Sequence, residues 1–207
     1  MLFMRQDTVF RLALLANLSA LSILLYYTIR IPLPFLFPGF LEIQFSNVPA
    51  IIAGFMVGPV GGAVVVVVRT LAKMPGSHTM NIGEFADMII GVPTVVVSAL
   101  IYMRHRTKKG AIVASLAGVA TWVFVAIVGN YFLFIPFYAE YLGLELLLNL
   151  LQIIPGITAE NYLWRFALYS ALPFNILLAS MVYGITFLVY KRLVHLIESI
   201  HSRLRDV

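Results

Sequence analysis

The chain contains 207 residues, of which 61% are hydrophobic and only 11% are charged. Soluble domains are typically about 45–50% apolar and about 25% charged, so the composition excludes a soluble domain and predicts an integral membrane protein embedded in lipid. The apolar residues are spread over the whole length without a linker, which predicts a single all-α membrane domain, 1–207. The absence of cysteine excludes disulfides, thiolate metal sites and cysteine nucleophiles.

The formal net charge is +5, and most of the basic residues lie beside the apolar segments. Ten of the fourteen basic residues occupy three places: Arg5 and Arg11; Arg104, Arg106, Lys108 and Lys109; and Lys191, Arg192, Arg203 and Arg205. Basic residues that flank apolar spans mark the cytoplasmic side of a membrane, so we interpret this charge as a topology signal and expect no nucleic-acid binding. Both termini and the loop 104–109 are therefore predicted to be cytoplasmic.

The apolar segments predict a six-transmembrane-helix bundle in which the second and third helices are short. The predicted helices are 9–31, 47–57, 61–73, 81–103, 111–137 and 163–190. We interpret the first as a retained helix and not a signal peptide, because its apolar run is too long and lacks a clear small-residue cleavage site. The second and third are short because Gly58-Pro59 and Gly61-Gly62 interrupt one apolar run near its middle.

Short or interrupted apolar segments with polar residues at their ends indicate a binding site in a transport protein. With the basic segments inside, the loops after the first, third and fifth helices face outside, and Leu144–Ile154 is predicted to be an interfacial helix over the outer mouth. Polar residues gather on this outer side: Glu42, Gln44, Asn81, Glu84, Asp87, Asn130 and Asn175. A site built from outer loops and helix ends has the geometry of uptake.

Glu84 and Asp87 have three interpretations. They lie three residues apart on one helix face, where they could pair with Arg69 and Lys73, contact a ligand, or act as acid and base. Catalysis would also need a nucleophile or a metal nearby. The sequence offers neither, because its four histidines show no metal-ligand spacing that fits the topology.

The two intramembrane asparagines and a stripe of alanines also leave alternatives open. A buried amide in a spanning helix is costly unless it is hydrogen-bonded, so Asn130 and Asn175 could bond another helix or contact a ligand. Ala13, Ala16 and Ala20 recur along the first helix, and such small residues let another helix approach closely. That helix could belong to this protein or to a partner.

Five fragments in order resemble the substrate-binding S components of energy-coupling factor (ECF) vitamin transporters, most closely the riboflavin-specific type. They are LEIQFSNVPAIIAGFMVGPVGG, NIGEFADMIIG, TKKGAI, NYFLFIPFYA and LPFN. The resemblance implies a six-helix bundle in the plasma membrane of a prokaryote, which captures riboflavin from the outside and is not itself an enzyme. It also implies a transmembrane coupling protein and two ABC ATPases as partners, with the alanine stripe of the first helix contacting the coupling protein. The outer loops would close over the vitamin.

A mostly apolar pocket with a few amides suits riboflavin, which is a transported ligand here and not a cofactor. We expect the flavin ring to pack on Leu41, Phe45 and Tyr131, and its polar edge or ribityl chain to bond Asn130 and Asn175. Further polar ligand contacts are expected from Glu42, Gln44, Asn81, Glu84 and Asp87.

Other ligands and functions remain as alternatives. Family members carry a lysine where this chain has Leu178, which leaves FMN or thiamine open. FMN would need cations for its phosphate, and the outer side offers only Arg30, Arg69, Lys73 and Arg165, so riboflavin ranks above it. A membrane scaffold would not explain the polar residues on the outer side, and an intramembrane enzyme would need a catalytic group that is missing.

Overall fold

The computed structural model describes the backbone of residues 2–205 and the side chains of residues 8–192. Its elements are α1 (Leu2–Thr28), β1 (Ile31–Pro32), β2 (Glu42–Ile43), α2 (Asn47–Val57), α3 (Pro59–Lys73), the 3-10 turn η1 (Met74–Gly76), α4 (Ile82–Arg104), α5 (Lys108–Gly129), the π-helical segment η2 (Asn130–Phe134), α6 (Ile135–Leu142), α7 (Leu144–Leu150), α8 (Tyr162–Phe166), the π-helical segment η3 (Ala167–Ala171) and α9 (Leu172–Arg205). The predicted helical fold is confirmed. The side chains of Arg5, Arg203 and Arg205 lie outside the described residues.

Each of the six predicted helical segments is present as helix. Four are long and apolar enough to cross a membrane: Thr8–Thr28, Ile82–Arg104, Lys108–Leu142 and Tyr162–Arg192. The other two, α2 and α3, have 11 and 15 residues. At a rise of about 1.5 Å per residue, neither reaches across a hydrocarbon core about 30 Å thick on its own. The count of six membrane passes therefore stays a prediction.

Several predicted boundaries differ in the structure. The first helix ends at Thr28 and not at residue 31, because Ile31 already pairs with Ile43 in the small antiparallel hairpin of β1 and β2. The fifth begins at Lys108, where the Thr107 side chain accepts a hydrogen bond from the amide of Gly110, and runs on to Leu142. The last continues beyond residue 190.

The short helix α2 forms the centre of the bundle. Ten of its eleven residues are buried, and it packs against α1, α3, α4 and α9. The turn into α3 is made by Gly58, whose φ of +114° is in the region that favours glycine. A Cβ at Gly62 would lie 2.3 Å from a methyl of Val95 and 2.9 Å from the carbonyl oxygen of Ala50, so this glycine permits the close approach of α3 to α2 and α4. The glycines that interrupt the apolar run therefore fold it back on itself.

Both π-helical segments precede a proline. Pro136 and Pro173 each follow a segment, η2 or η3, by two residues. Proline has no N–H and its ring crowds the carbonyl of residue i−4, so a wider turn before it relieves the clash without ending the helix. Such π-bulges occur often at functional sites, and these two lie beside Asn130 and Asn175.

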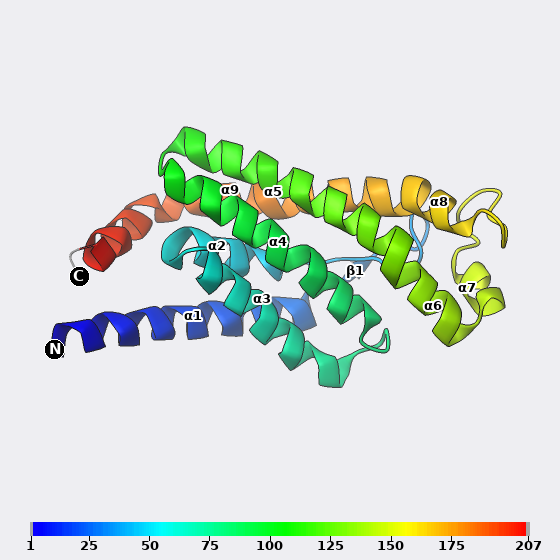
Figure 1. Ribbon diagram of the computed structural model, residues 1–207, viewed down its shortest axis with the longest axis horizontal. Helices are drawn as coiled ribbons and strands as arrows, with labels where there is room; N and C mark the ends of the chain where they lie inside the picture. The colour runs from blue at the N-terminus through cyan, green and yellow to red at the C-terminus, as the bar shows by residue number, and fades with distance from the viewer. Residues whose placement is uncertain (1, 206–207) are drawn as a thin grey trace.

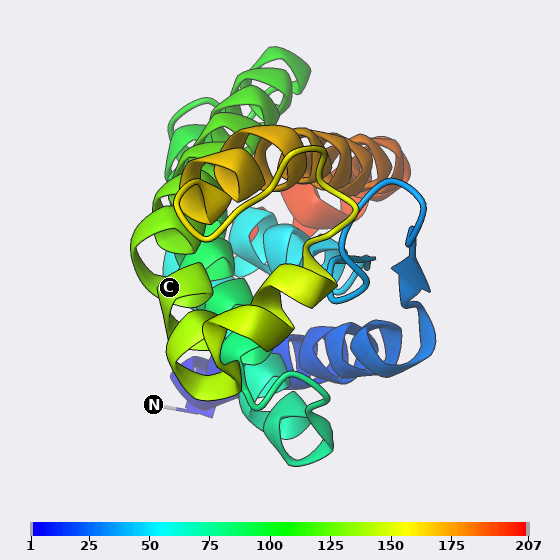
Figure 2. The ribbon, with the colours of Figure 1, turned by 90° about the vertical axis from the view of Figure 1, so that its right-hand side faces the viewer.

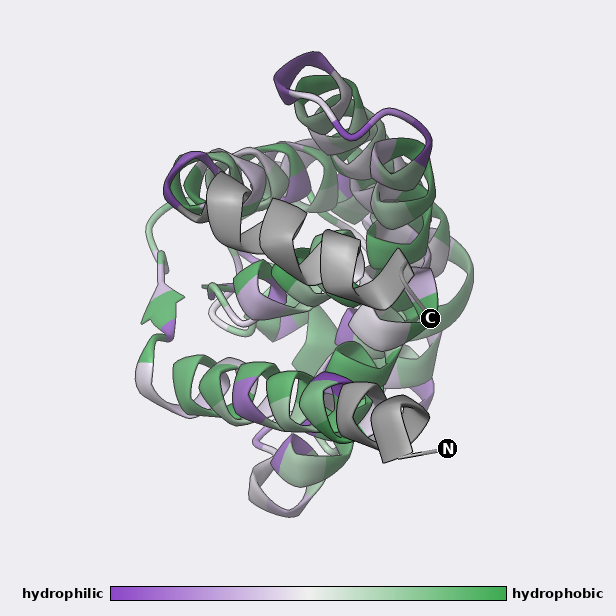
Figure 3. Cartoon of the chain, turned by 90° about the vertical axis from the view of Figure 1, so that its left-hand side faces the viewer, coloured by the Kyte–Doolittle hydropathy of each residue, from purple (hydrophilic) through white to green (hydrophobic). Residues whose placement is uncertain are grey.

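The two ends of the bundle differ in composition. Figure 1 places the start of α1, the end of α9, the α2–α3 turn and the α4–α5 loop at one end. Figure 3 looks onto that end, where hydrophilic colour marks the α4–α5 loop above largely hydrophobic helices. Figure 2 looks onto the opposite end, which carries the β-hairpin, the loop before α4 and the segment of α6, α7 and α8. The predicted interfacial helix corresponds to α7, which covers this second end through the buried Leu147 and Leu151.

Candidate functional site

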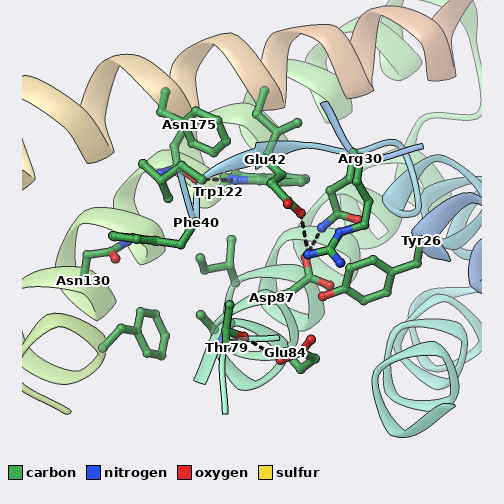
Figure 4. A pocket seen from close by; sticks show the side chains of 18 of the residues that line it. Tyr26, Arg30, Phe40, Glu42, Thr79, Glu84, Asp87, Trp122, Asn130 and Asn175 are labelled. Carbon is green, nitrogen blue, oxygen red and sulfur yellow. Dashed lines mark hydrogen bonds and ion pairs between the residues drawn. The ribbon is translucent and has the colours of Figure 1, made fainter. Parts of the chain in front are cut away.

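A cavity lies near the end of the bundle opposite the basic α4–α5 loop. It holds about 850 Å³ of space between side chains, part of it open to solvent. Figure 4 shows the cavity and labels ten of its side chains. The lining residues are Tyr26, Arg30, Phe40, Leu41, Glu42, Gln44, Thr79, Gly83, Glu84, Ala86, Asp87, Ile90, Trp122, Asn130, Phe134, Tyr138, Phe174, Asn175 and Leu178.

Two asparagine amides face this cavity from the two long helices. The Nδ2 of Asn175 donates to the carbonyl oxygen of Ala171 at 2.7 Å, and its Oδ1 accepts from the indole Nε1 of Trp122 at 3.0 Å (Figure 4). The Nδ2 of Asn130 donates to the carbonyl oxygen of Ala126 at 2.7 Å. Both residues are buried. Each amide is thus held by its own helix and keeps hydrogen-bonding capacity for a ligand.

The π-helical segments explain which side chains reach the cavity. In η2, Asn130 and Phe134 are buried and line it, whereas Tyr131 packs its ring edge-on against the exposed Phe132. Tyr131, which we expected to pack on the flavin ring, is not part of the cavity lining. In the last helix, η3 is followed at once by Phe174, Asn175 and Leu178, which all line the cavity.

Asp87 lies at the centre of a buried polar network. Its Oδ2 is 2.5 Å from the Nη2 of Arg69, a residue with no exposed surface, and its Oδ1 accepts from the Nε2 of Gln44 at 3.0 Å. Arg69 also donates to the hydroxyl of Ser46 at 2.6 Å, and Asn47 donates to Asp87 at 3.4 Å. Of the three interpretations of Asp87, pairing with Arg69 is the one that this contact shows. The network ties α4, α3 and the start of α2 together beneath the cavity.

Glu84 organises the loop before α4. Its Oε2 accepts from the hydroxyls of Ser77 at 2.6 Å and Thr79 at 2.9 Å. The Ser77 hydroxyl accepts in turn from the backbone amide of Asn81 at 2.9 Å. Lys73, one of the two cations with which these acids could pair, does not pair with Glu84: its Nζ donates to the carbonyl oxygen of Gly76 at 2.9 Å, because the η1 turn brings that carbonyl under the end of α3.

An ion pair forms part of the cavity lining. The Nη2 of Arg30, just beyond α1, lies 2.5 Å from the Oε2 of Glu42 in β2. These side chains are 23% and 25% exposed, whereas that of Asp87 is 9% exposed. The hairpin of β1 and β2 places the pair, since Glu42 stands opposite Pro32 in its register. Figure 4 shows the pair beside Tyr26.

Of the ten predicted ligand residues, the structure gathers seven around one cavity: Leu41, Glu42, Gln44, Glu84, Asp87, Asn130 and Asn175. It does not bring Phe45, Asn81 or Tyr131 to the lining. Phe45 packs against the main hydrophobic core. Asn81 adopts a left-handed conformation with φ of +66° at the start of α4, and its Oδ1 is buried without a hydrogen-bond partner.

Several lining residues were missed by the sequence analysis, notably Tyr26, Phe40, Trp122 and Phe174. They are apolar or aromatic residues within apolar segments, and nothing in their spacing separates a cavity wall from a core or a lipid-facing surface. Only Trp122 carries a signal that could have found it, because a buried indole N–H needs an acceptor.

Comparisons with known proteins agree with this arrangement. The model of the family described as "ECF transporter, substrate-specific component" matches residues 10–190. The chain belongs to this family. The chain is similar to the riboflavin transporter RibU of Staphylococcus aureus, with 29% identity over 92% of this chain and 93% of the relative, and to the riboflavin transporter FmnP of Bacillus subtilis, with 27% identity over 93% and 96%.

A solved structure supports the same assignment. It is described as the S component of a bacterial ECF transporter, and it aligns with a TM-score of 0.71 and 27% identity over 91% of this chain and 98% of the solved chain. The protein is therefore a membrane transport component and not an enzyme. Among the residues whose side chains are described, no cluster of three or more histidine, aspartate or glutamate residues could hold a metal ion.

The alanine stripe of this S component lies on an open face of α1. Ala13, Ala16 and Ala20 are all exposed, while α1 packs on α2 and α3 through other residues. The interpretation that the stripe packs against the protein's own helices is therefore wrong.

Proposed function

We propose that this S component captures riboflavin from outside the cell and delivers it inward. The observation that carries the proposal is the pair of buried amides, Asn130 and Asn175, which face a largely apolar cavity with unused hydrogen-bonding capacity. The relatives named riboflavin transporters support it, since they align with nearly the whole chain.

The chemistry of the cavity matches riboflavin. The vitamin has a flat apolar ring, a polar ring edge with donors and acceptors, and an uncharged ribityl chain. Leu41, Trp122 and Phe174 offer apolar surface for the ring, and the amides of Asn130 and Asn175 offer both donors and acceptors for the polar edge or the ribityl hydroxyls. Gln44 and the carboxylates of Glu42, Glu84 and Asp87 supply the remaining polar groups of the lining.

The proposed orientation places the cavity on the outer side and both termini in the cytoplasm. Basic residues mark the cytoplasmic side, and the loop with Arg104, Arg106 and Lys109 lies at the same end as the start of α1 and the end of α9 (Figure 1). The cavity lies toward the opposite end, under the β-hairpin and α7. We count α2 and α3, which are joined at the cytoplasmic end, as two passes. The proposed number of membrane passes is therefore six.

The proposed partners are a transmembrane coupling protein and two ABC ATPases. The exposed alanine stripe on α1 supports this, because small residues allow close packing of a partner helix in lipid. Replacing Ala16 with leucine should reduce co-purification of the coupling protein. Riboflavin affinity should not change, since Ala16 does not line the cavity.

Purified protein tests the ligand directly. The protein should carry flavin absorption when isolated from cells, and it should quench the fluorescence of added riboflavin on titration. FMN and thiamine serve as competitors, and each should displace riboflavin only at much higher concentration. Colourless protein that leaves riboflavin fluorescence unchanged would disprove the proposal, and preferential displacement by thiamine or FMN would reassign the ligand.

A further inference from the structure

Two cations near the cavity, Arg69 and Lys73, already interact with other groups of the protein. Arg69 is fully buried and pairs with Asp87. The Nζ of Lys73 donates to a backbone carbonyl and lies 4.3 Å from the centre of the Tyr27 ring. Neither Arg69 nor Lys73 belongs to the lining. A negatively charged ligand in the cavity would therefore contact neither Arg69 nor Lys73.

A third outer cation, Arg165, is also engaged elsewhere. Its guanidinium donates to the carbonyl oxygen of Pro155 and lies 5.1 Å from the centre of the Trp164 ring. It does not line the cavity. Among the described residues that do, Arg30 is the one cation, and Glu42 holds it at 2.5 Å.

The lining carries more negative than positive charge. Three carboxylates face the cavity, from Glu42, Glu84 and Asp87, against the single guanidinium of Arg30. Arg69 balances Asp87 from behind. Glu84 accepts hydrogen bonds from two hydroxyls, which are neutral donors. An uncharged ligand is unaffected by this balance, whereas an anion meets unfavourable charge on entering.

We propose that the Arg30–Glu42 pair excludes phosphorylated flavins, and that Glu42 determines this selectivity. The inference rests on the proposed riboflavin function. A phosphate monoester carries a charge of about −1.5 to −2 at neutral pH and binds best to a guanidinium fork. In this cavity it must displace the Glu42 carboxylate from Arg30 and leave that carboxylate unpaired beside it. The ribityl terminus of riboflavin, being a neutral hydroxyl, does not have to break the pair.

The position of the pair fits this role. The apolar and amide walls made by Trp122, Phe174 and Asn175 are buried, while the side chains of Arg30 and Glu42 are 23% and 25% exposed. A flavin with its ring among the buried aromatic side chains would direct a terminal phosphate toward the more exposed pair, because a doubly charged group is costly to bury.

The test compares riboflavin and FMN as probes on the purified full chain, by fluorescence quenching. Glu42→Gln should raise FMN affinity relative to riboflavin by about tenfold or more, because Arg30 becomes free to bind the phosphate. The gain should shrink as salt is added and should vanish in the double variant Arg30→Gln/Glu42→Gln. Glu140→Gln is the matched control, since it removes one exposed carboxylate outside the cavity. The ratio of its FMN affinity to its riboflavin affinity should equal that of the wild type.

A second variant keeps the inference testable if the Glu42→Gln protein fails to bind riboflavin. Arg30→Gln keeps the carboxylate and removes the cation, so FMN should weaken relative to riboflavin. An FMN-to-riboflavin ratio that stays within about twofold of the wild type in both variants would overturn the inference, as would a gain that survives in the double variant. A wild-type chain that binds no riboflavin would instead refute the proposed function.

Discussion

Replacing Asn175 with alanine removes the side chain that the structure sets most firmly at the ligand cavity. An asparagine amide has two N–H donors and an oxygen with two lone pairs. Ala171 takes one donor and Trp122 takes one lone pair. One donor and one lone pair therefore remain for the ligand, which matches a ring edge or a hydroxyl that both donates and accepts.

The expected effect follows from these two remaining bonds. A neutral hydrogen bond contributes about 0.5–1.5 kcal/mol net, so two contribute about 1–3 kcal/mol. The Kd for riboflavin should therefore rise by about 5- to 150-fold in Asn175→Ala. The assay is a titration of purified protein against riboflavin fluorescence, with thermal unfolding of the variant measured alongside it.

Asn149→Ala is the control for this experiment. It removes an exposed amide outside the cavity lining, so the riboflavin Kd should stay within about twofold of the wild type. A folded Asn175→Ala protein whose Kd stays within about twofold of the wild type would refute the assignment of this amide to the ligand.

Three further predictions concern the other polar groups of the cavity. Asn130→Ala should raise the riboflavin Kd by a similar factor, about 5- to 150-fold, in the same titration. Asp87→Ala leaves the fully buried Arg69 without its counter-ion and should lower the free energy of unfolding by about 3–5 kcal/mol, seen as a reduced thermal midpoint; an unchanged midpoint would contradict the buried pair. Glu84→Gln weakens the charge-assisted hydrogen bonds to the loop 77–81 and should speed riboflavin release in stopped-flow measurements, whereas an unaltered rate would separate that loop from ligand retention.

Sequence reasoning predicted the helices because each is a long or interrupted apolar run, and such runs indicate helices in a membrane protein. It also located the α2–α3 turn, because Gly58 and the following proline stop one helix and start the next. It missed the hairpin at Ile31 and Ile43, since two residues per strand give no periodicity to detect. The extension of the fifth predicted helix beyond residue 137 to Leu142 was also missed.

Residues of the cavity lining were predicted where a polar side chain stands out within an apolar helix, as Asn130 and Asp87 do. They were missed where the lining is aromatic, as at Trp122, because helices that are apolar on all sides do not reveal which face is inward. Tyr131 was predicted to pack on the flavin ring, but successive residues on a helix point in different directions, and Asn130 and Phe134 are the residues of η2 that line the cavity.

Equilibrium dialysis with riboflavin tests the account most directly, with the wild type compared to the double variant Asn130→Ala/Asn175→Ala. We predict that the wild-type chain retains riboflavin in equimolar amount and that the double variant, although folded, retains almost none. Equal retention by both proteins would place the vitamin elsewhere, and no retention by the wild type would contradict riboflavin capture itself.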